Sequence, residues 1–528
     1  VYAGQKMHEN TENGVYQNLS NRAQSLLVKL SEAGAYIEPE ILELPDGMIE
    51  KFLEENKELL VYRQYFENMI RQKEHVLDEA REALLAAVGE LSEGPKDIFT
   101  MFNNADLRFP VIKGEDGEDV EVTHGRYVTL LQSQDREVRK AAFEALYGMY
   151  GKYRNTLAAT YRANVKQAVF FAKTRKYESD LEAALSGSHI PVTVYKNLIE
   201  VVHAFLPQMY RYVELRRKML KVSELHMYDL YVPVVQSAEQ KIPFEQAKKM
   251  VLAGLKPMGE EYRKLLEEGF SSRWIDIYEN QGKRSGAYSW GAYGTHPYVL
   301  LNYQENLNNV FTLAHEMGHA LHSWYSDATQ PYVYAGYKIF VAEVASTCNE
   351  ALLIHHLLEE TKEPKERAYL INYFLEQFRT TLFRQTMFAE FEKITHGMQE
   401  NGETLTADRL CKVYYDLNRE YFGENICIDK EIELEWARIP HFYTPFYVYQ
   451  YATGFSAAIA LSKKILEEGE RAVEDYKKFL RGGSSMYPLE LLRVAGVDME
   501  QKKPVEDALQ VFVQYLDEME RLMGHDEV

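Results

Sequence analysis

The sequence predicts a mainly α-helical protein with a small β-sheet beside one helix that carries closely spaced His and Glu residues. Apolar residues recur at three- and four-residue steps through most of the 528 residues, which is the period of an amphipathic helix. Strand-like alternation is confined to short runs bounded by Gly and Pro. The apolar fraction of 46% and the aromatic fraction of 12% are those of a folded chain.

In chain order, the helical pattern first covers residues 1–91. Two strand-like runs within residues 109–123 then flank Asp116-Gly117, which predicts a β-hairpin. Ser133 and Asp135 open a very long stretch of helical pattern that runs to about Ala172. We therefore predict an N-terminal helical domain over residues 1–180 that contains this hairpin.

The remaining residues, 181–528, are predicted to form the catalytic domain. It begins with helix to about Leu220, followed by an extended run over residues 227–235 and a helix over 242–268. Short strands are then predicted at 274–278, 286–294 and 298–303. A short motif at residues 315–319 follows these strands. The chain beyond this motif is helix-rich to Met523.

That motif is His315-Glu316-Met317-Gly318-His319, on a helix that Asn308 or Asn309 is predicted to cap. Two histidines four apart lie on one helix face, so both imidazoles can hold one metal ion while Glu316 reaches a water molecule beside it. Zinc suits imidazole and carboxylate ligands. The alternative is a solvated polar face or a pair of ordinary core histidines. His322, three residues beyond His319, is interpreted as a neighbour of the site.

The best candidate for a third metal ligand is Glu343, in the otherwise apolar run Ile339–Ala345. Burying a carboxylate is costly unless a cation compensates it, although an amphipathic helix whose acid reaches solvent remains equally open. Glu350 lies two turns along the same face and is predicted to hold a histidine ligand from behind. Ser346 shares that face and is a weaker candidate.

A third group of candidates follows Pro440. His441 is predicted to stand on a turn, and Tyr447 and Tyr451, four apart, are predicted to share a helix face. Hydrolysis of a peptide bond passes through an oxyanion, which Tyr or His can stabilise by donating a hydrogen bond. The alternative is aromatic packing, because Tyr is abundant here, with 38 residues.

Composition narrows the class of protein. The formal net charge is −20 and no run of Lys and Arg stands out, so no nucleic-acid or membrane partner is expected. Three cysteines without paired spacing indicate a reducing compartment. The chain starts with Val1 rather than Met, so we expect an N-terminal piece to precede it, and the cytoplasm is the expected location.

Several stretches, in order, resemble oligoendopeptidase F, in the thimet-oligopeptidase-like group of zinc metallopeptidases. They are Phe102–Pro110, Gly286–Gly291, Thr312–Ser323, Phe340–Thr347, Arg384–Glu392 and His441–Gly454. The resemblance extends over most of the chain from about residue 100. It implies a two-lobed helical ellipsoid split by a deep central channel, with a zincin-like catalytic core and one Zn²⁺ on the channel floor.

The resemblance also implies residue roles. It assigns His315, His319 and Glu343 as zinc ligands and Glu316 as general base. It maps transition-state stabilisation to His441, Tyr447 and Tyr451, with a spacing one residue different from the thimet branch. Residues 286–291 resemble the family's edge strand that pairs with the substrate backbone.

We therefore expect a zinc endopeptidase that cleaves internal bonds of short unstructured oligopeptides. A metallo-aminopeptidase is an alternative, but it would need an acidic anchor for the free N-terminus, which the sequence does not reveal. A non-catalytic helical scaffold that retains the motif is the alternative from another class.

Overall fold

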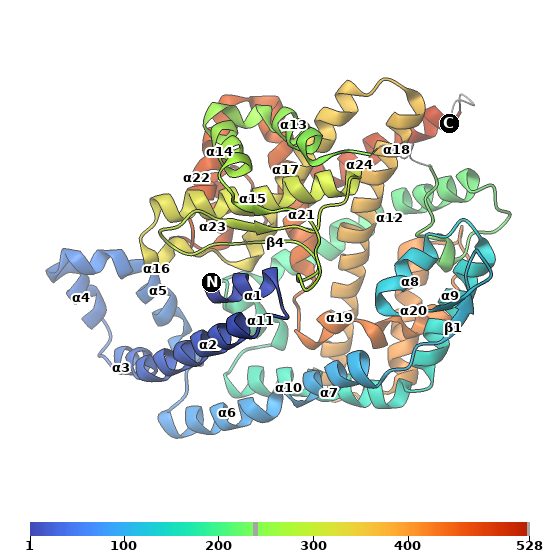
Figure 1. The fold of residues 1–528 in the computed structure, drawn as a ribbon. Helices are drawn as coiled ribbons and strands as arrows, with labels where there is room; N and C mark the ends of the chain where they lie inside the picture. Colours follow the sequence, from blue (N-terminus) through green and yellow to red (C-terminus); the bar gives the residue numbers. More distant parts are fainter. Residues whose placement is uncertain (236–240, 525–528) are drawn as a thin grey trace. The chain divides into compact units, whose positions relative to one another are not determined.

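The computed structural model describes residues 1–235 and 241–524, and helices dominate it (Figure 1). The chain forms two compact units. Unit 1 comprises Val1–Val76, Glu239–Glu360 and Ala457–Asp498, and unit 2 comprises Leu77–Ala238, Thr361–Ser456 and Met499–Val528. The mainly α-helical class predicted from the sequence is confirmed.

Unit 1 is built from helices and one sheet. Its N-terminal helices are α1 (Tyr2–Glu9), α2 (Gly14–Gly34), α3 (Ile37–Leu42), α4 (Met48–Glu55), η1 (Lys57–Tyr62), α5 (Arg63–Gln72) and η2 (Lys73–His75). The later helices are α13 (Phe244–Gly254), η5 (Lys256–Met258), α14 (Gly259–Ser271), α15 (Leu307–Thr329), α16 (Tyr332–Ala335), α17 (Ile339–Glu360), α22 (Glu470–Arg481) and α23 (Pro488–Val494).

The sheet of unit 1 has three short strands, β3 (Ile275–Asp276), β4 (Tyr288–Trp290) and β5 (Tyr298–Leu300). β5 lies in the middle, parallel to β3 and antiparallel to β4, with Ser289 opposite Val299. Both β4 and β5 lie against α15 (Figure 1). The small sheet predicted beside the HExxH helix is therefore present, and β4 is one of its edges.

Helix α15 starts two to three residues earlier than the sequence suggested. Asn306 is its N-cap, and the Asn306 side chain accepts a hydrogen bond from the backbone N–H of Asn309 at 3.0 Å. Asn308 and Asn309 are therefore inside the first turn, and the prediction that one of them caps the helix is wrong. Both share the polar character that made them plausible caps, so composition alone did not separate them from Asn306.

Unit 2 is also helical. Its first part holds α6 (Glu79–Ser92), α7 (Gly94–Met101), η3 (Phe102–Asp106), β1 (Val111–Lys113), β2 (Asp119–Glu121), α8 (His124–Leu131), α9 (Arg136–Gly151), α10 (Arg154–Thr174), α11 (Asp180–Ser186), α12 (Val192–Met219) and η4 (Met227–Asp229). The rest holds α18 (Pro364–Gln377), η6 (Phe378–Phe383), α19 (Arg384–Glu400), α20 (Ala407–Phe422), η7 (Lys430–Arg438), η8 (Pro440–Tyr443) and α24 (Lys503–Met523). Helix α21 (Tyr449–Glu468) contributes residues to both units.

The predicted hairpin forms, with β1 antiparallel to β2 and Gly117 in the left-handed region at φ 78°. Asp135 caps α9, as its side chain accepts the N–H of Glu137. The long helical stretch predicted from residue 133 forms as two helices, because the chain breaks at Lys152 and Tyr153 between α9 and α10. A helical period on both sides of a short break gives no sequence signal for the break itself.

The extended run predicted over residues 227–235 is also wrong at its start, where η4 forms instead. Asp229 at the end of η4 is fully buried, and the guanidinium groups of Arg136 and Arg139 each lie 2.8 Å from its carboxylate. This ion-pair cluster links η4 to α9 and outweighs the β propensity of the apolar residues around it.

The compact units are discontinuous in sequence, whereas the sequence suggested one boundary near residue 180. That position lies at the start of α11, inside unit 2. Residues far apart in the chain pack together here, and local patterns carry no information about such pairings. In the part of the chain that the structure describes, none of the helices is both long and apolar enough to cross a membrane.

Candidate active site

Helix α15 and helix α17 bring together the three predicted metal ligands. The imidazole rings of His315 and His319 lie one turn apart on α15, with centroids 4.8 Å apart. Oε2 of Glu343, on α17, lies 3.3 Å from Nε2 of His315 and 3.6 Å from Nε2 of His319. One donor atom from each residue lies within 4.8 Å of the others. Two imidazole nitrogens and one carboxylate oxygen thus converge on one point.

The close approach of the two helices depends on Gly318. A Cβ at this position would lie 2.6 Å from Cα of Ser346 and 2.8 Å from the carbonyl oxygen of Ala345. Both are backbone atoms of α17, which no rotamer change can move aside. The glycine between the two histidines therefore lets α17 come near enough to present Glu343.

A buried amide locks the same helix pair. The side chain of Asn349, on α17, is fully buried, and its Nδ2 donates to the carbonyl oxygen of Ala314 at 3.0 Å. The hydroxyl of Tyr262, on α14, donates to Oδ1 of Asn349 at 2.9 Å. Hydrogen bonds in such a buried place fix the register of α17 against α15.

Glu350 contacts His315 at Nδ1, the ring nitrogen that does not face Glu343. Nδ1 of His315 and Oε1 of Glu350 are 2.5 Å apart, so Glu350 holds the Nδ1 proton and directs Nε2 toward Glu343. Ser346, the weaker candidate, donates its hydroxyl to the backbone oxygen of Glu343 at 3.1 Å and lies 3.4 Å from its carboxylate. Both residues thus contact a predicted ligand.

The Glu316 side chain is buried beside the histidine pair, and the backbone N–H of Ser289, in β4, donates to its carboxylate. Its Oε2 has no hydrogen-bond partner among the described residues. Burial, together with the neighbouring carboxylates of Glu343 and Glu350, raises the pKa of Glu316 to about 7. An acid with this pKa can accept and release a proton near neutral pH.

The charges suit a bound cation. Burial lowers the pKa of His315, but Glu350 and Glu343 outweigh this effect and hold the pKa well above its ordinary value. Burial and the adjacent His315 lower the pKa of His319 to about 4, so this imidazole is neutral and free to act as a ligand. A divalent cation would replace the protons that His315 and Glu316 otherwise hold. The donor set and the orphaned Glu316 oxygen therefore fit a zinc ion.

His322 is a buried neighbour. Its ring stacks on Tyr337 with centroids 3.7 Å apart, and burial followed by His319 lowers the pKa of His322 to about 3. This ring is neutral, and its packing against Tyr337 matches the interpretation of His322 as a neighbour.

His441, Tyr447 and Tyr451 lie together in unit 2. Nε2 of His441 and the hydroxyl of Tyr451 are 3.4 Å apart, and the rings of Tyr447 and Tyr451 have centroids 5.5 Å apart. His441 stands in η8, a short turn as predicted, and burial followed by Arg384 lowers its pKa. The prediction that both tyrosines share a helix face is wrong, because α21 begins at Tyr449 and Tyr447 lies in the preceding turn.

A buried acid that the sequence reading missed supports that turn. The fully buried Glu392, on α19, accepts the backbone N–H of Phe446 through Oε1 at 2.8 Å. Phe446 has φ 55°, an unfavourable value for a side chain of its size. Burial holds the pKa of Glu392 well above its ordinary value, so the group is neutral. The signal available in the sequence was the position of Glu392, an acidic residue among aromatic residues at helical spacing.

Comparison with known proteins places the chain in a class. Residues 129–511 match the model of peptidase family M3, and residues 40–109 match the model described as oligopeptidase F. The chain belongs to peptidase family M3, which is a family of metallopeptidases. The resemblance inferred from the sequence is thereby confirmed.

Individual relatives cover almost the whole chain. It is 50% identical to oligopeptidase PepF of Bacillus subtilis over 99% of this chain and 78% of that protein. It is 44% identical to an oligoendopeptidase F homolog of Lactococcus lactis subsp. lactis, over 99% and 87% of the two chains. The crystal structure of oligoendopeptidase-F from Enterococcus faecium superposes with a TM-score of 0.80 at 44% identity, covering 99% of this chain and 90% of that one.

Proposed function

We propose that the protein is a zinc-dependent endopeptidase that hydrolyses internal bonds of short, unstructured oligopeptides. One Zn²⁺ per chain would be held by His315, His319 and Glu343. The observation that carries this proposal is that the Nε2 atoms of His315 and His319 lie 3.3 and 3.6 Å from one oxygen of Glu343, beside the buried Glu316.

The residues divide the chemistry among them. Bound zinc would supply a Lewis acid that polarises the scissile carbonyl and lowers the pKa of a water molecule. Glu316 takes a proton from that water and passes it to the leaving amine, a role that suits its pKa of about 7 in the metal-free site. Glu350 holds the Nδ1 proton of His315 and so keeps Nε2 directed at the metal position.

Strand β4 suits the positioning of an extended substrate. Its partner β5 occupies one side, and the N–H of Ser289 donates to the carboxylate of Glu316. A peptide that pairs with the edge of the sheet at β4 would carry its scissile bond past the general base. His441, Tyr447 and Tyr451 provide hydrogen-bond donors of the kind that stabilise an oxyanion.

The family resemblance supports a limit on substrate size. A channel floor admits an extended peptide, whereas a folded protein would have to unfold first. At about 3.3 Å per extended residue, substrates of roughly 5–20 residues are expected.

The reduced state of Cys348, Cys411 and Cys427 is compatible with action in the cytoplasm.

The decisive experiment uses a quenched oligopeptide that is blocked at both ends, with casein and a stable globular protein as further substrates. The expected result is internal cleavage of the oligopeptide, loss of activity with a chelator, recovery on addition of Zn²⁺, and an intact globular protein by mass spectrometry. Cleavage only of peptides with a free N-terminus would identify an aminopeptidase instead. Hydrolysis that persists after complete metal removal would overturn the proposal.

A further inference from the structure

Two loops of unit 2, distant in the sequence, meet at a second group of potential metal ligands. One loop follows α12 and contains Glu224 and His226, and the other joins α20 to η7 and contains Cys427. His226 and Cys427 pair in a parallel bridge, in which the N–H of Cys427 donates to the carbonyl oxygen of Leu225 at 2.8 Å. The backbone therefore fixes the two loops side by side.

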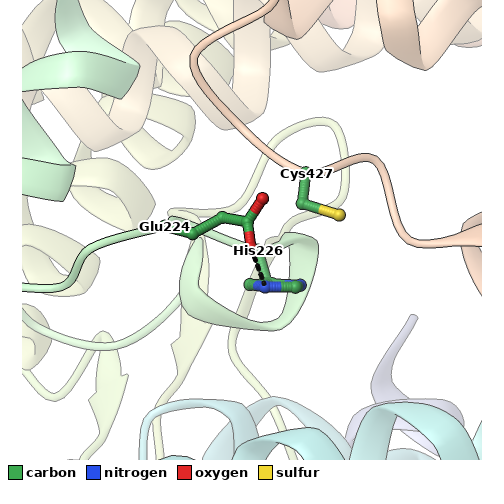
Figure 2. A group of neighbouring side chains, drawn as sticks. All are labelled: Glu224, His226 and Cys427. Carbon is green, nitrogen blue, oxygen red and sulfur yellow. Dashed lines mark ion pairs between the residues drawn. The ribbon is translucent and has the colours of Figure 1, made fainter.

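The donor atoms of this group are close enough to share one ion. A carboxylate oxygen of Glu224, an imidazole nitrogen of His226 and Sγ of Cys427 lie within 4.8 Å of one another (Figure 2). Nε2 of His226 is 3.4 Å from Oε2 of Glu224. Ligands at about 2.0–2.3 Å from a tetrahedral zinc ion are roughly 3.3–3.8 Å apart, so small side-chain rotations suffice to complete the geometry.

A carboxylate orients the histidine for this role. Oδ1 of Asp429 lies 2.7 Å from Nδ1 of His226, and Oδ2 of Asp429 accepts the backbone N–H of Met227 at 2.8 Å. The ring also stacks on Tyr228 at 4.8 Å between centroids. With the proton on Nδ1, the lone pair of Nε2 faces Glu224. The same arrangement orients many metal-binding histidines in proteins.

The electrostatic surroundings favour a cation. Arg136 donates to the carbonyl oxygen of Glu224, but its guanidinium, like that of Arg139, pairs with the carboxylate of Asp229. The carboxylates of Asp429, Glu224 and Glu431 act on Cys427, and their negative charge favours a cation at this place. A bound metal would displace the thiol proton of Cys427.

We propose that Glu224, His226 and Cys427 bind a second divalent cation of borderline softness, Zn²⁺ being the best match, at a structural site separate from the HExxH centre. Sulfur, nitrogen and oxygen donors together select this class of metal over Mg²⁺ or Ca²⁺. Water would fill the remaining position. The ion would tie the loop after α12 to the segment that leads into η7.

Cobalt substitution tests the proposal, because a thiolate bound to Co²⁺ gives a near-ultraviolet charge-transfer band. His315, His319 and Glu343 contain no sulfur, so that band reports only on the second site. The metal-depleted full chain should take up two equivalents of Co²⁺ and show the band. Cys427→Ser should lose the band and one equivalent while its oligopeptide hydrolysis, restored by Zn²⁺, stays unchanged.

Matched variants separate metal binding from damage to the fold. Cys411→Ser replaces a buried thiol of the same unit and should keep the band. Asp429→Asn keeps an acceptor for Met227 and should weaken Co²⁺ binding at the second site about 10–100-fold. A wild-type protein without a thiolate band, or a band that survives Cys427→Ser, would overturn the second metal site. Failure of the HExxH site would instead remove the other equivalent and leave the band.

Discussion

Glu350 holds His315 from behind, with Oε1 2.5 Å from Nδ1, while Glu343 faces the opposite nitrogen of the same ring at 3.3 Å. Two carboxylates seven residues apart on α17 thus lie close to the two different nitrogens of one imidazole ring. Because they occupy different sides, their loss should have different consequences.

We expect Glu343→Ala to lower zinc occupancy after dialysis, because it removes a ligand. Glu350→Ala should keep most of the zinc and lose activity, since His315 becomes less basic and less well oriented, with an effect of about 10–100-fold. Metal analysis alongside peptide hydrolysis measures both. If Glu350→Ala is the variant that loses its zinc, the assignment of the two carboxylates is reversed.

Glu316→Gln should keep the metal and the fold but lose at least about 10²–10⁴-fold in turnover. Glutamine has nearly the same shape and can accept the N–H of Ser289, but it does not take up a proton at neutral pH. Zinc content and thermal unfolding serve as the controls. Near-normal hydrolysis by the zinc-loaded variant would remove Glu316 from the mechanism.

The sequence indicated candidate residues for the site but not the packing that brings them together. His315, Glu316 and His319 follow from helix periodicity, because residues four apart share a face. Glu343 was proposed as a ligand because it is a single acid in an apolar run. Gly318 was seen only as part of the motif, because its role depends on a backbone contact with residues of another helix.

The helices and strands, too, were predicted where the signal is local and missed where it depends on distant residues. Helical period and turn residues predicted α15 and the β1–β2 hairpin, since both signals are local. The break at Lys152, the turn at η4 and the start of α21 were missed. At η4 the decisive interaction joins Asp229 to Arg136 and Arg139, and such long-range pairs leave no pattern in a single sequence.

Gly318→Ala tests the close approach of α15 and α17. The added Cβ would meet backbone atoms of Ser346 and Ala345 below 3.0 Å, so the helices must separate and carry Glu343 away from the histidines. Overpacking of this kind costs about 1–3 kcal/mol. We expect a lower melting temperature and weaker zinc binding, measured by competition with a chelator.

The matched control for that variant is Gly148→Ala in α9, where a Cβ would meet nothing within 4 Å. There the better helix propensity of Ala should stabilise the protein by up to about 1 kcal/mol. Equal effects of the two substitutions on stability and zinc affinity would contradict the packing role of Gly318.

Tyr447→Phe and Tyr451→Phe test the oxyanion donors. Each change removes only a hydroxyl, so the aromatic packing of the pair at 5.5 Å is kept. At least one variant should lose about 10²–10³-fold in kcat with little change in KM, because the donor acts mainly in the transition state. Wild-type kinetics in both variants would leave the pair with a packing role alone.

The last prediction concerns acid stability and a buried ion-pair cluster in unit 2. Glu376 lies 2.6 Å from Arg379 and 3.2 Å from Arg216, and both guanidinium groups are almost fully buried. Burial alone would raise the pKa of Glu376, but the two arginines outweigh it and lower the pKa to about 2. A carboxyl with a depressed pKa stabilises the fold above its unfolded value of 4.5, and this contribution is lost as the pH falls toward 2. At neutral pH it is worth on the order of 3 kcal/mol. Glu376→Gln should therefore melt well below the wild type at pH 7, and the difference should shrink steadily below about pH 4.5.

The control is Glu144→Gln. The Glu144 carboxylate is exposed and lies 3.9 Å from Lys140, so this substitution should change stability by no more than about 0.5 kcal/mol. A gap between wild type and Glu376→Gln that is the same at pH 3 and pH 7 would show that the charge of Glu376 is not what stabilises this cluster.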